Sequence, residues 1–454
     1  MKENGNRQDA YIDTHKDRFI EELKAFLRFP SVSAQQARDA DTMACAQWLR
    51  AHLAELGLDA EMVDQGGQPI IVARGAGASG RRVAVYGHYD VQPEDPLDLW
   101  HNGPFDPIVK DNVIYARGAT DDKGQFFAHV KAVEALLQTE GRLPCNVVFL
   151  IEGEEESGGE ALARYVRSTG KDLNPDALVI SDGDMHDANT PAINYGLRGI
   201  VTFEVTITGP DHDLHSGAYG GAVANPAVVL AQILGQCVSP EGRVTIPGFY
   251  DDVIPLEDWE VENIRKLQFD DQTLVRDTGS PRLHGEPGQG SLARLWARPT
   301  FEINGIYGGY QGQHTKTIIP SRAAAKLSTR LVPNQEYDAM RDRVFDYIRS
   351  ICPDTVSLEI TEFGGGPPVL IDTATPELQV AMDALRHGFN AEPVFTRSGG
   401  SIPIITTFAQ QWGCPIILMG LGLDSDGPHS PNEHFSLDSF VKGIKASAQL
   451  LKTI

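Results

Sequence analysis

The feature that most constrains the fold is a series of short apolar runs that alternate with longer amphipathic segments. Four runs are continuously apolar over four or five residues, as in strands buried on both faces: 70–73, 83–86, 147–151 and 177–180. Segments with apolar residues at helical spacing precede or separate them: 17–29, 42–56 and 124–137. This alternation predicts an α/β domain with a mainly parallel sheet.

The pattern changes near Gly199, because apolar and polar residues alternate strictly from 201 to 208. Such alternation is typical of a strand with one covered face. A helix, two strands, a second helix and a last strand are predicted after it: 225–236, 301–306, 323–332, 335–351 and 356–361. This β-α-β-β-α-β order predicts a ferredoxin-like α+β domain over 199–366. We expect it to be inserted into an α/β domain built from 1–198 and 367–454.

Composition narrows the possible partners and the location. The 454 residues include 39 Lys and Arg against 62 Asp and Glu, which gives a net charge of −23. This excess of acids argues against binding to nucleic acid or to an anionic membrane surface. The first twenty residues are polar and charged, and the five cysteines are scattered without CxxC spacing. We therefore expect a cytoplasmic protein with neither a nucleic acid nor a membrane as partner.

Acidic residues and histidines gather where the predicted strands end. The loops after four strands carry, in chain order, His88 with Asp90, Glu155 with Glu156, Asp182 with Asp184, and Asp426 with His429. A fifth loop, with Asp121 and Asp122, opens the helix at 124–137. One such loop alone says little, because acids often cap or solvate turns. Since parallel strands present their carboxyl ends at one edge, we expect the five loops to converge on one site.

The residue types in these loops favour a pair of metal ions. Imidazole and carboxylate ligands without thiolates suit Zn, Mn or Co. Two histidines and several carboxylates exceed the needs of one tetrahedral zinc, so two ions bridged by a carboxylate fit better. Asp90 can orient the imidazole of His88, and of the adjacent Glu155 and Glu156 one can bind metal while the other acts as a base. Either Asp182 or Asp184 can be the ligand that follows its strand.

Other catalytic motifs are missing from the sequence or lack the expected context. The chain has no GxSxG, no Walker phosphate loop and no HExxH helix. The stretch GAGASG at 75–80 matches GxGxxG, but no helix follows it. We expect it to form a hairpin turn between two strands.

Four motifs are specific in combination: YGHYDVQP at 86–93, RGATDDKG at 117–124, EGEEESG at 152–158 and GPHSPNE at 427–433. With them the chain resembles, over nearly its whole length, the M20 family of dinuclear metallopeptidases, and within it the cytosolic non-specific dipeptidase and carnosinase branch. The resemblance implies a catalytic domain of the zinc-exopeptidase type with two divalent ions per subunit, first Zn²⁺, with Mn²⁺ or Co²⁺ as alternatives. It implies that Asp121 bridges the ions, with His88 and Asp182 completing one site and Glu156 and His429 the other.

The same resemblance assigns catalytic roles. Asp90 supports His88, and Glu155 is the general base that activates the bridging water. The peptide bond after Asp121 is expected to be cis. His215, in the stretch DLHSGAYGG at 213–221, is expected to enter the active site of the partner subunit and stabilise the oxyanion.

The inserted domain resembles a lid that also forms a homodimer, and it carries residues that match substrate-binding positions. Arg330 is expected to bind the terminal carboxylate of a small peptide substrate, a task that suits its bidentate guanidinium. Thr317, in the same domain, and Ser401, in the α/β domain, match two further positions of the substrate pocket. The stretch 240–299 resembles an elaboration of this lid, and the sequence assigns it no role.

The implied activity is hydrolysis of the amide bond in dipeptides or similar small substrates with a free C-terminal carboxylate. One residue departs from the dipeptidase branch, because Ser398 stands where an acidic residue usually receives the free amine of the substrate. A deacylase of N-acyl amino acids therefore remains an alternative within the family. An inactive, metal-stabilised binding or scaffold protein is the alternative from another class, and the intact Asp90 and Glu155 argue against it.

Overall fold

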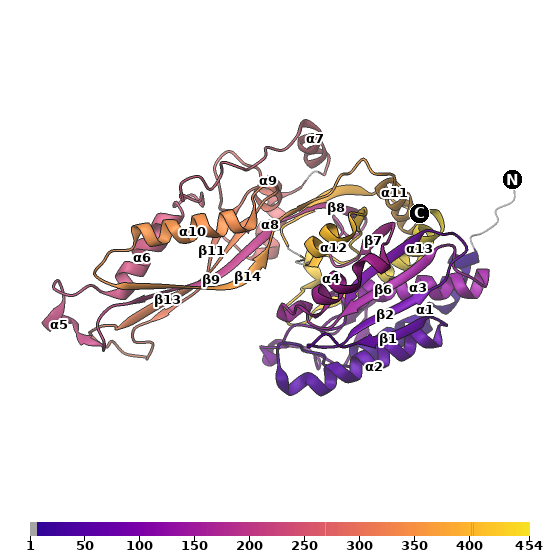
Figure 1. Ribbon diagram of the computed structural model, residues 1–454, viewed down its shortest axis with the longest axis horizontal. Coiled ribbons are helices and arrows are strands. Elements are labelled where there is room, and N and C mark those ends of the chain that lie inside the picture. Colours follow the sequence, from indigo (N-terminus) through magenta and orange to yellow (C-terminus); the bar gives the residue numbers. More distant parts are fainter. Residues whose placement is uncertain (1–6, 268, 401, 403) are drawn as a thin grey trace. The chain divides into compact units, whose positions relative to one another are not determined.

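The computed structural model describes residues 7–454 except 268, 401 and 403, and its chain divides into two units (Figure 1). The first unit comprises Met1–Tyr195, Ile371–Thr396 and Thr407–Ile454, and the second comprises Gly196–Leu370 and Arg397–Thr406. The segment Arg397–Thr406 differs from the division expected from the sequence, which places it with the α/β domain. The reason is that Arg397 is ion-paired with Glu260 of the second unit.

A mixed sheet forms the centre of the first unit. Its order is β1-β2-β6-β3-β7-β17-β8-β15, and β16 also pairs with β8. The strands are β1 (Asp59–Val63), β2 (Ile70–Gly75), β3 (Arg82–His88), β6 (Asn146–Glu152), β7 (Ala177–Ile180), β8 (Ala192–Leu197), β15 (Val369–Leu370), β16 (Val394–Ser398) and β17 (Ile416–Leu418). The four central strands, β6, β3, β7 and β17, are parallel, whereas β1, β2, β8 and β15 pair antiparallel. The prediction of a mainly parallel central sheet is confirmed.

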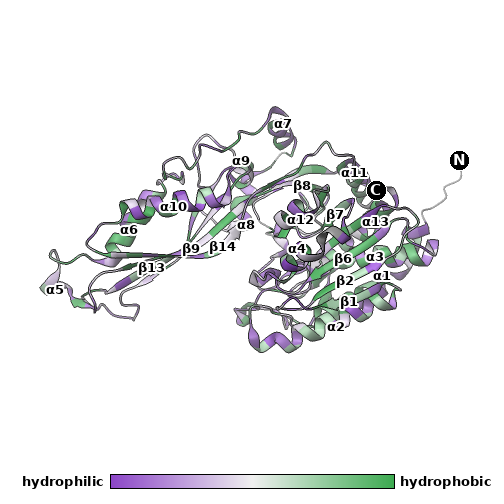
Figure 2. Cartoon of the chain, viewed as in Figure 1, coloured by the Kyte–Doolittle hydropathy of each residue, from purple (hydrophilic) through white to green (hydrophobic). Residues whose placement is uncertain are grey.

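Helices cover this sheet, and one of them is buried almost throughout. They are α1 (Arg7–Leu27), α2 (Asp39–Glu55), α3 (Lys123–Glu140), α4 (Ala161–Leu173), α11 (Pro376–Phe389), α12 (Ile404–Trp412) and α13 (Leu437–Thr453). Helix α3 is buried continuously from Lys123 to Leu136, because it packs against α1, α13 and β3. In Figure 2 the central strands are mainly hydrophobic, whereas α2 mixes hydrophilic and hydrophobic residues. Within the described part of the chain, no helix has the length and apolar character needed to cross a bilayer.

The second unit contains the predicted β-α-β-β-α-β succession. Its members are β9 (Gly199–Thr208), α6 (Pro226–Cys237), β11 (Thr300–Gly308), β13 (Arg322–Leu331), α10 (Tyr337–Ile351) and β14 (Ser357–Gly366). The strands form an antiparallel sheet in the order β11-β13-β9-β14. Alternate residues of β9, among them Val201, Phe203 and Val205, form one core with α6 and α10. Three short helices lie between α6 and β11: α7 (Asp258–Lys266), α8 (Asp271–Thr278) and α9 (Ser291–Ala297).

The hairpin predicted at residues 75–80 is wrong. Strand β6 lies between β2 and β3, so these two strands are not neighbours. The connecting loop instead runs along the segment that leads into β6, where Ala78 N donates to Leu143 O at 2.9 Å and Gly77 N donates to Asn146 Oδ1 at 2.9 Å. A Cβ atom at Gly77 would lie 2.0 Å from the carbonyl carbon of Cys145, so this close approach requires glycine.

A buried lysine joins the first three helices. Lys131 of α3 is completely buried, and its Nζ lies 2.5 Å from Glu22 Oε2 of α1 and 2.9 Å from Glu134 Oε2. The same Nζ lies 2.7 Å from Nε2 of His52 in α2. Burial, and then the charge of Lys131, lower the pKa of His52 to about 4, so its ring is neutral and can accept a hydrogen bond from the ammonium group.

We predict that Lys131→Met lowers the free energy of unfolding by about 3 kcal/mol, because it removes the buried cation shared by Glu22 and Glu134 and leaves Glu134 paired with Arg18 alone. The measurement is urea unfolding at pH 7. The matched control is Arg386→Met, which removes an exposed ion pair with Glu392 and should leave the midpoint unchanged. Equal midpoints for the two variants would contradict the assigned role of Lys131.

Candidate metal centre

Three parallel strands deliver acidic and imidazole side chains to one edge of the sheet. Strand β3 ends at His88, and β6 ends at Glu152, shortly before Glu156. Strand β7 ends at Ile180, two residues before Asp182. Because β6, β3 and β7 are parallel neighbours, their carboxyl ends lie side by side.

Asp121 reaches this edge by a route that the sequence did not indicate. The strand before it, β5 (Val113–Tyr115), belongs to a separate three-stranded sheet with β4 (Ile108–Lys110) and β18 (His434–Ser436). This loop therefore does not follow a strand of the central sheet, although Asp121 lies with the acidic and imidazole side chains of the other loops. Strand periodicity predicts that residues 113–115 are extended, but it does not identify the partner strand.

Among the residues that the structure describes, two groups of side chains could hold a metal ion. One is His88, Asp121 and Asp182, the other is Asp121, Glu156 and His429, and in each group the ligand atoms lie within 4.8 Å of one another. His88 Nε2 lies 3.1 Å from Asp121 Oδ1 and 3.8 Å from Asp182 Oδ2. His429 Nε2 lies 2.9 Å from Asp121 Oδ2 and 3.4 Å from Glu156 Oε2. Asp121 thus turns one carboxylate oxygen to each histidine.

Buried Asp90 orders two parts of this centre. Its Oδ1 lies 3.4 Å from Nδ1 of His88, on the side of the ring opposite Asp121. The backbone N–H groups of Glu155 and Glu156 donate to the Asp90 carboxylate at 3.3 and 3.1 Å. Ser33 Oγ donates to it at 2.6 Å. Asp90 therefore positions not only the imidazole, as the sequence suggested, but also the turn that carries the two glutamates.

The carboxylates of this centre repel one another in a buried setting. Burial, followed by the charge of Asp121, raises the pKa of Glu156 to about 9 and that of Asp182 to about 6. Burial also opposes ionisation of Asp121, but hydrogen bonds to His429 and His88 outweigh it and hold the pKa of Asp121 below its usual value. A cation bound between these side chains would stabilise the ionised forms of Asp121, Glu156 and Asp182.

The donor atoms fit divalent metal ions. His88 Nε2 is buried and lies 3.1 Å from Asp121 Oδ1 and 3.8 Å from Asp182 Oδ2, so a neutral His88 ring presents a nitrogen lone pair beside two carboxylate oxygens, where a cation would be held. The two groups combine two imidazoles with three carboxylates and no thiolate, which suits Zn²⁺, Mn²⁺ or Co²⁺. Asp182 belongs to one of these groups, and Asp184 belongs to neither. Burial, followed by the charge of Asp424, raises the pKa of Asp184 to about 8.

The buried residue Glu433 holds the loop of Asp121 and was given no role by the sequence reasoning. Its Oε2 accepts hydrogen bonds of 2.9 Å from Arg117 Nη1 and from Gly118 N. Its Oε1 accepts bonds of 3.0 and 3.1 Å from the N–H groups of Thr120 and Asp121. In the sequence, the position of Glu433 at the end of the motif GPHSPNE could have indicated that it has a role in the site. The peptide bond between Asp121 and Asp122 is cis, as the resemblance implies.

Three of the predicted substrate-binding residues, His215, Thr317 and Arg330, belong to the second unit. His215 lies in β10 (Leu214–His215), which pairs with β12 (Ile318–Ile319), and Ser216 N donates to Thr317 O at 3.0 Å. Arg330 lies half-buried in β13, opposite Ile200. Ser401 lies outside the described residues.

Comparisons with known proteins find similar sequences and structures over nearly the whole chain. Residues 84–453 match the model of peptidase family M20/M25/M40. The chain is 33% identical to the Cys-Gly metallodipeptidase DUG1 of Candida albicans, with 96% of this chain and 94% of that protein covered. It is 32% identical to the human Beta-Ala-His dipeptidase, with 96% and 90% covered. The solved structure of the dipeptidase Dug1p from Saccharomyces cerevisiae has a TM-score of 0.88 at 30% identity, with 98% and 97% covered.

We predict that Glu433→Gln lowers the affinity for metal about 10- to 100-fold, because the amide cannot accept from all four donors around the Asp121 loop. Competition of the purified protein with a chelator of known affinity measures this change. Glu377→Gln, which alters an acid of the same unit that pairs with Arg81, is the matched control and should bind metal normally. Unchanged metal affinity in Glu433→Gln would remove the assigned role.

Proposed function

The chain belongs to peptidase family M20/M25/M40, and from this premise we propose that it is a metal-dependent dipeptidase. Its substrates are dipeptides or similar small molecules with a free C-terminal carboxylate. The observation that carries the proposal is the position of Asp121, which belongs to both ligand groups. The names of the Cys-Gly and Beta-Ala-His dipeptidases support cleavage of a dipeptide amide bond.

Two divalent ions per subunit complete the site. His88, Asp121 and Asp182 hold one, and Asp121, Glu156 and His429 hold the other. When bound, the ions polarise the scissile carbonyl and lower the pKa of the attacking water. Zn²⁺ is the first choice for these ligands, and Mn²⁺ and Co²⁺ suit the same donor atoms.

Glu155 is the general base. It belongs to neither ligand group, although its neighbour Glu156 does, so its carboxylate is free to exchange protons. Burial raises the pKa of Glu155 well above the usual value, which makes it a stronger base once ionised. It takes the proton of the attacking water and delivers it to the leaving amine. Asp90 holds the backbone of Glu155 and orients His88.

Residues of the second unit bind the substrate. Arg330 pairs with the terminal carboxylate, and Thr317 and Ser401 add polar contacts. His215, contributed across a homodimer formed by this unit, stabilises the oxyanion. The exposure of His215 and the partial burial of the Arg330 guanidinium support these roles, and the resemblance in sequence supports the dimer. A cytoplasmic location is proposed from the sequence alone.

Ser398 favours a second candidate, a deacylase of N-acyl amino acids. Its hydroxyl accepts a hydrogen bond of 3.1 Å from Gly400 N and carries no negative charge to pair with a free amine. A scaffold protein is the less supported candidate, because a purely structural site has no use for the buried carboxylate of Glu155.

Metal removal and substrate choice test the proposal together. The purified protein is stripped with a chelator, reloaded separately with Zn²⁺, Mn²⁺ or Co²⁺, and assayed on dipeptides and on N-acyl amino acids with the same C-terminal residue. We expect stripping to abolish turnover, reloading to restore it, and dipeptides to give the higher kcat/KM. Higher kcat/KM for the N-acyl series would identify the deacylase, and a change in stability without turnover under any metal would identify the scaffold.

The base is tested by Glu155→Gln, which we expect to lower kcat about 10²- to 10⁴-fold because the amide cannot accept a proton. Metal content, measured by elemental analysis, should stay unchanged because Glu155 is not a ligand. The matched control is Glu154→Gln, which makes the same change one residue away and keeps an acceptor for Gln68 N. Turnover of Glu155→Gln close to that of the control would exclude Glu155 as the base.

A further inference from the structure

The insertion between α6 and β11 contains two buried acidic side chains that are paired with arginines. Glu260 in α7 pairs with Arg397, which lies outside the insertion and directly precedes Ser398. Glu286 pairs with Arg243 and Arg298, which lie within the insertion or at its edge. The first pair thus connects the insertion to a distant part of the chain, whereas the second is internal.

The pair of Glu260 and Arg397 is closely packed. Their side chains are 4% and 8% exposed, so neither charge has much access to water. The other carboxylate oxygen of Glu260 accepts a hydrogen bond of 2.7 Å from Glu257 N and thereby caps the start of α7. The stem of Arg397 lies against Gly196 of β8, where a Cβ atom would come within 3.1 Å of it. Glu260 therefore holds α7 and Arg397 in one arrangement.

The insertion and Arg198 also contact the residues that follow Arg397. Arg198 Nε donates to Gly399 O at 3.1 Å. A Cβ atom at Gly399 would lie 2.8 Å from Arg198 Nη2 and 3.4 Å from the carbonyl oxygen of Leu295 in α9. The segment 397–400 is thus held by α7 at its first residue and by α9 and Arg198 at its third.

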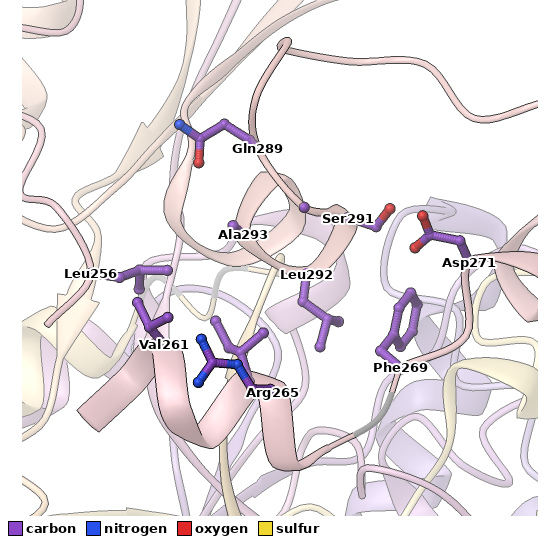
Figure 3. A pocket seen from close by; sticks show the side chains of 11 residues that line it. Leu256, Val261, Arg265, Phe269, Asp271, Gln289, Ser291, Leu292 and Ala293 are labelled. Atoms are coloured by element: carbon purple, nitrogen blue, oxygen red, sulfur yellow. The ribbon is translucent and has the colours of Figure 1, made fainter. Parts of the chain in front are cut away.

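A cavity of about 460 Å³ separates the two helices that hold this segment. Figure 3 shows Val261 and Arg265 of α7 on one side and Leu292 and Ala293 of α9 on the other. None of the candidate metal ligands lines it. Residues of α7 and α9 thus face each other across this cavity, and the buried ion pair of Glu260 with Arg397 is a contact that holds α7 beside it.

We propose that the insertion 240–299 is a specificity element that positions the segment 397–400, with Glu260 and Arg397 as positioning residues. The inference rests on the proposed function, in which Ser398 faces the amino end of the substrate. A buried charge pair has one favourable arrangement, and losing either partner leaves the other charge buried alone. If Ser398 is displaced, we therefore expect kcat/KM to change to different extents for substrates with a free amine at that end and for substrates with an acyl group there.

The test compares Glu260→Gln with Glu286→Gln in the full-length, metal-loaded protein. Both variants neutralise one buried glutamate of the insertion, but only the first lies against Arg397. For Glu260→Gln we expect the ratio of kcat/KM between a dipeptide and the matching N-acyl amino acid to change about tenfold, chiefly through KM. For Glu286→Gln the ratio should stay constant, and Glu260→Asp, which keeps the charge, should recover part of the wild-type ratio.

Hydrogen exchange of peptides covering residues 396–400 gives a readout that does not depend on turnover. Glu260→Gln should accelerate exchange there, including at the Gly400 amide bonded to Ser398, whereas Glu286→Gln should not. Equal exchange in the two variants, or an unchanged substrate ratio in Glu260→Gln, would overturn the inference. A wild-type protein inactive on the whole panel would instead refute the proposed function, and the exchange data would still decide whether Glu260 positions the segment.

Discussion

The candidate metal centre depends on one buried carboxylate that is not itself a ligand. Glu433 accepts hydrogen bonds from Arg117 and from three backbone N–H groups of residues 118–121, and so fixes the loop of Asp121. Burying an anion is costly unless several donors satisfy it, and here four donors do so. Because Asp121 belongs to both ligand groups, a shift of this loop would alter both at once. Asp121 and Glu433 are 312 positions apart in sequence. The centre therefore forms only when the C-terminal part of the first unit has folded.

Burial between the parallel strands opposes ionisation of the carboxylates in the candidate site, whereas a bound cation would favour it. Parallel strands bring Asp182 and Glu156 together in a buried place, where burial and neighbouring charge raise their pKa values. This concentration of acids lowers the stability of the metal-free protein and makes metal binding favourable for folding. Glu155 adds a further buried carboxylate that belongs to neither ligand group, and a buried acid of this kind is typical of a functional site.

The residues of the site were more predictable than the pairing of the strands. His88 and Asp182 could be found because carboxyl ends of parallel strands share an edge, a rule that needs only the strand positions. The place of β6 between β2 and β3 could not be found, because periodicity reports which residues are buried and not which strand lies beside them. Periodicity also could not show that β5 belongs to a separate sheet. Nor could it show the role of Glu433, because the hydrogen-bond partners of Glu433 are distant in sequence. The assignment of Arg397–Thr406 to the second unit likewise reflects long-range contacts, among them the ion pair of Arg397 with Glu260 and the hydrogen bond from Arg198 to Gly399.

The division into units separates the candidate metal ligands from the residues proposed to bind the substrate. The candidate ligands and the proposed base, Glu155, belong to the first unit. The second unit contains Arg330 and also the segment after Arg397, although most of the chain around that segment belongs to the first unit. A buried ion pair such as Glu260–Arg397 adds little net stability compared with apolar packing of the same volume. Its directional bonding is better suited to holding the neighbouring Ser398 in one place, which is the positioning role proposed for this pair.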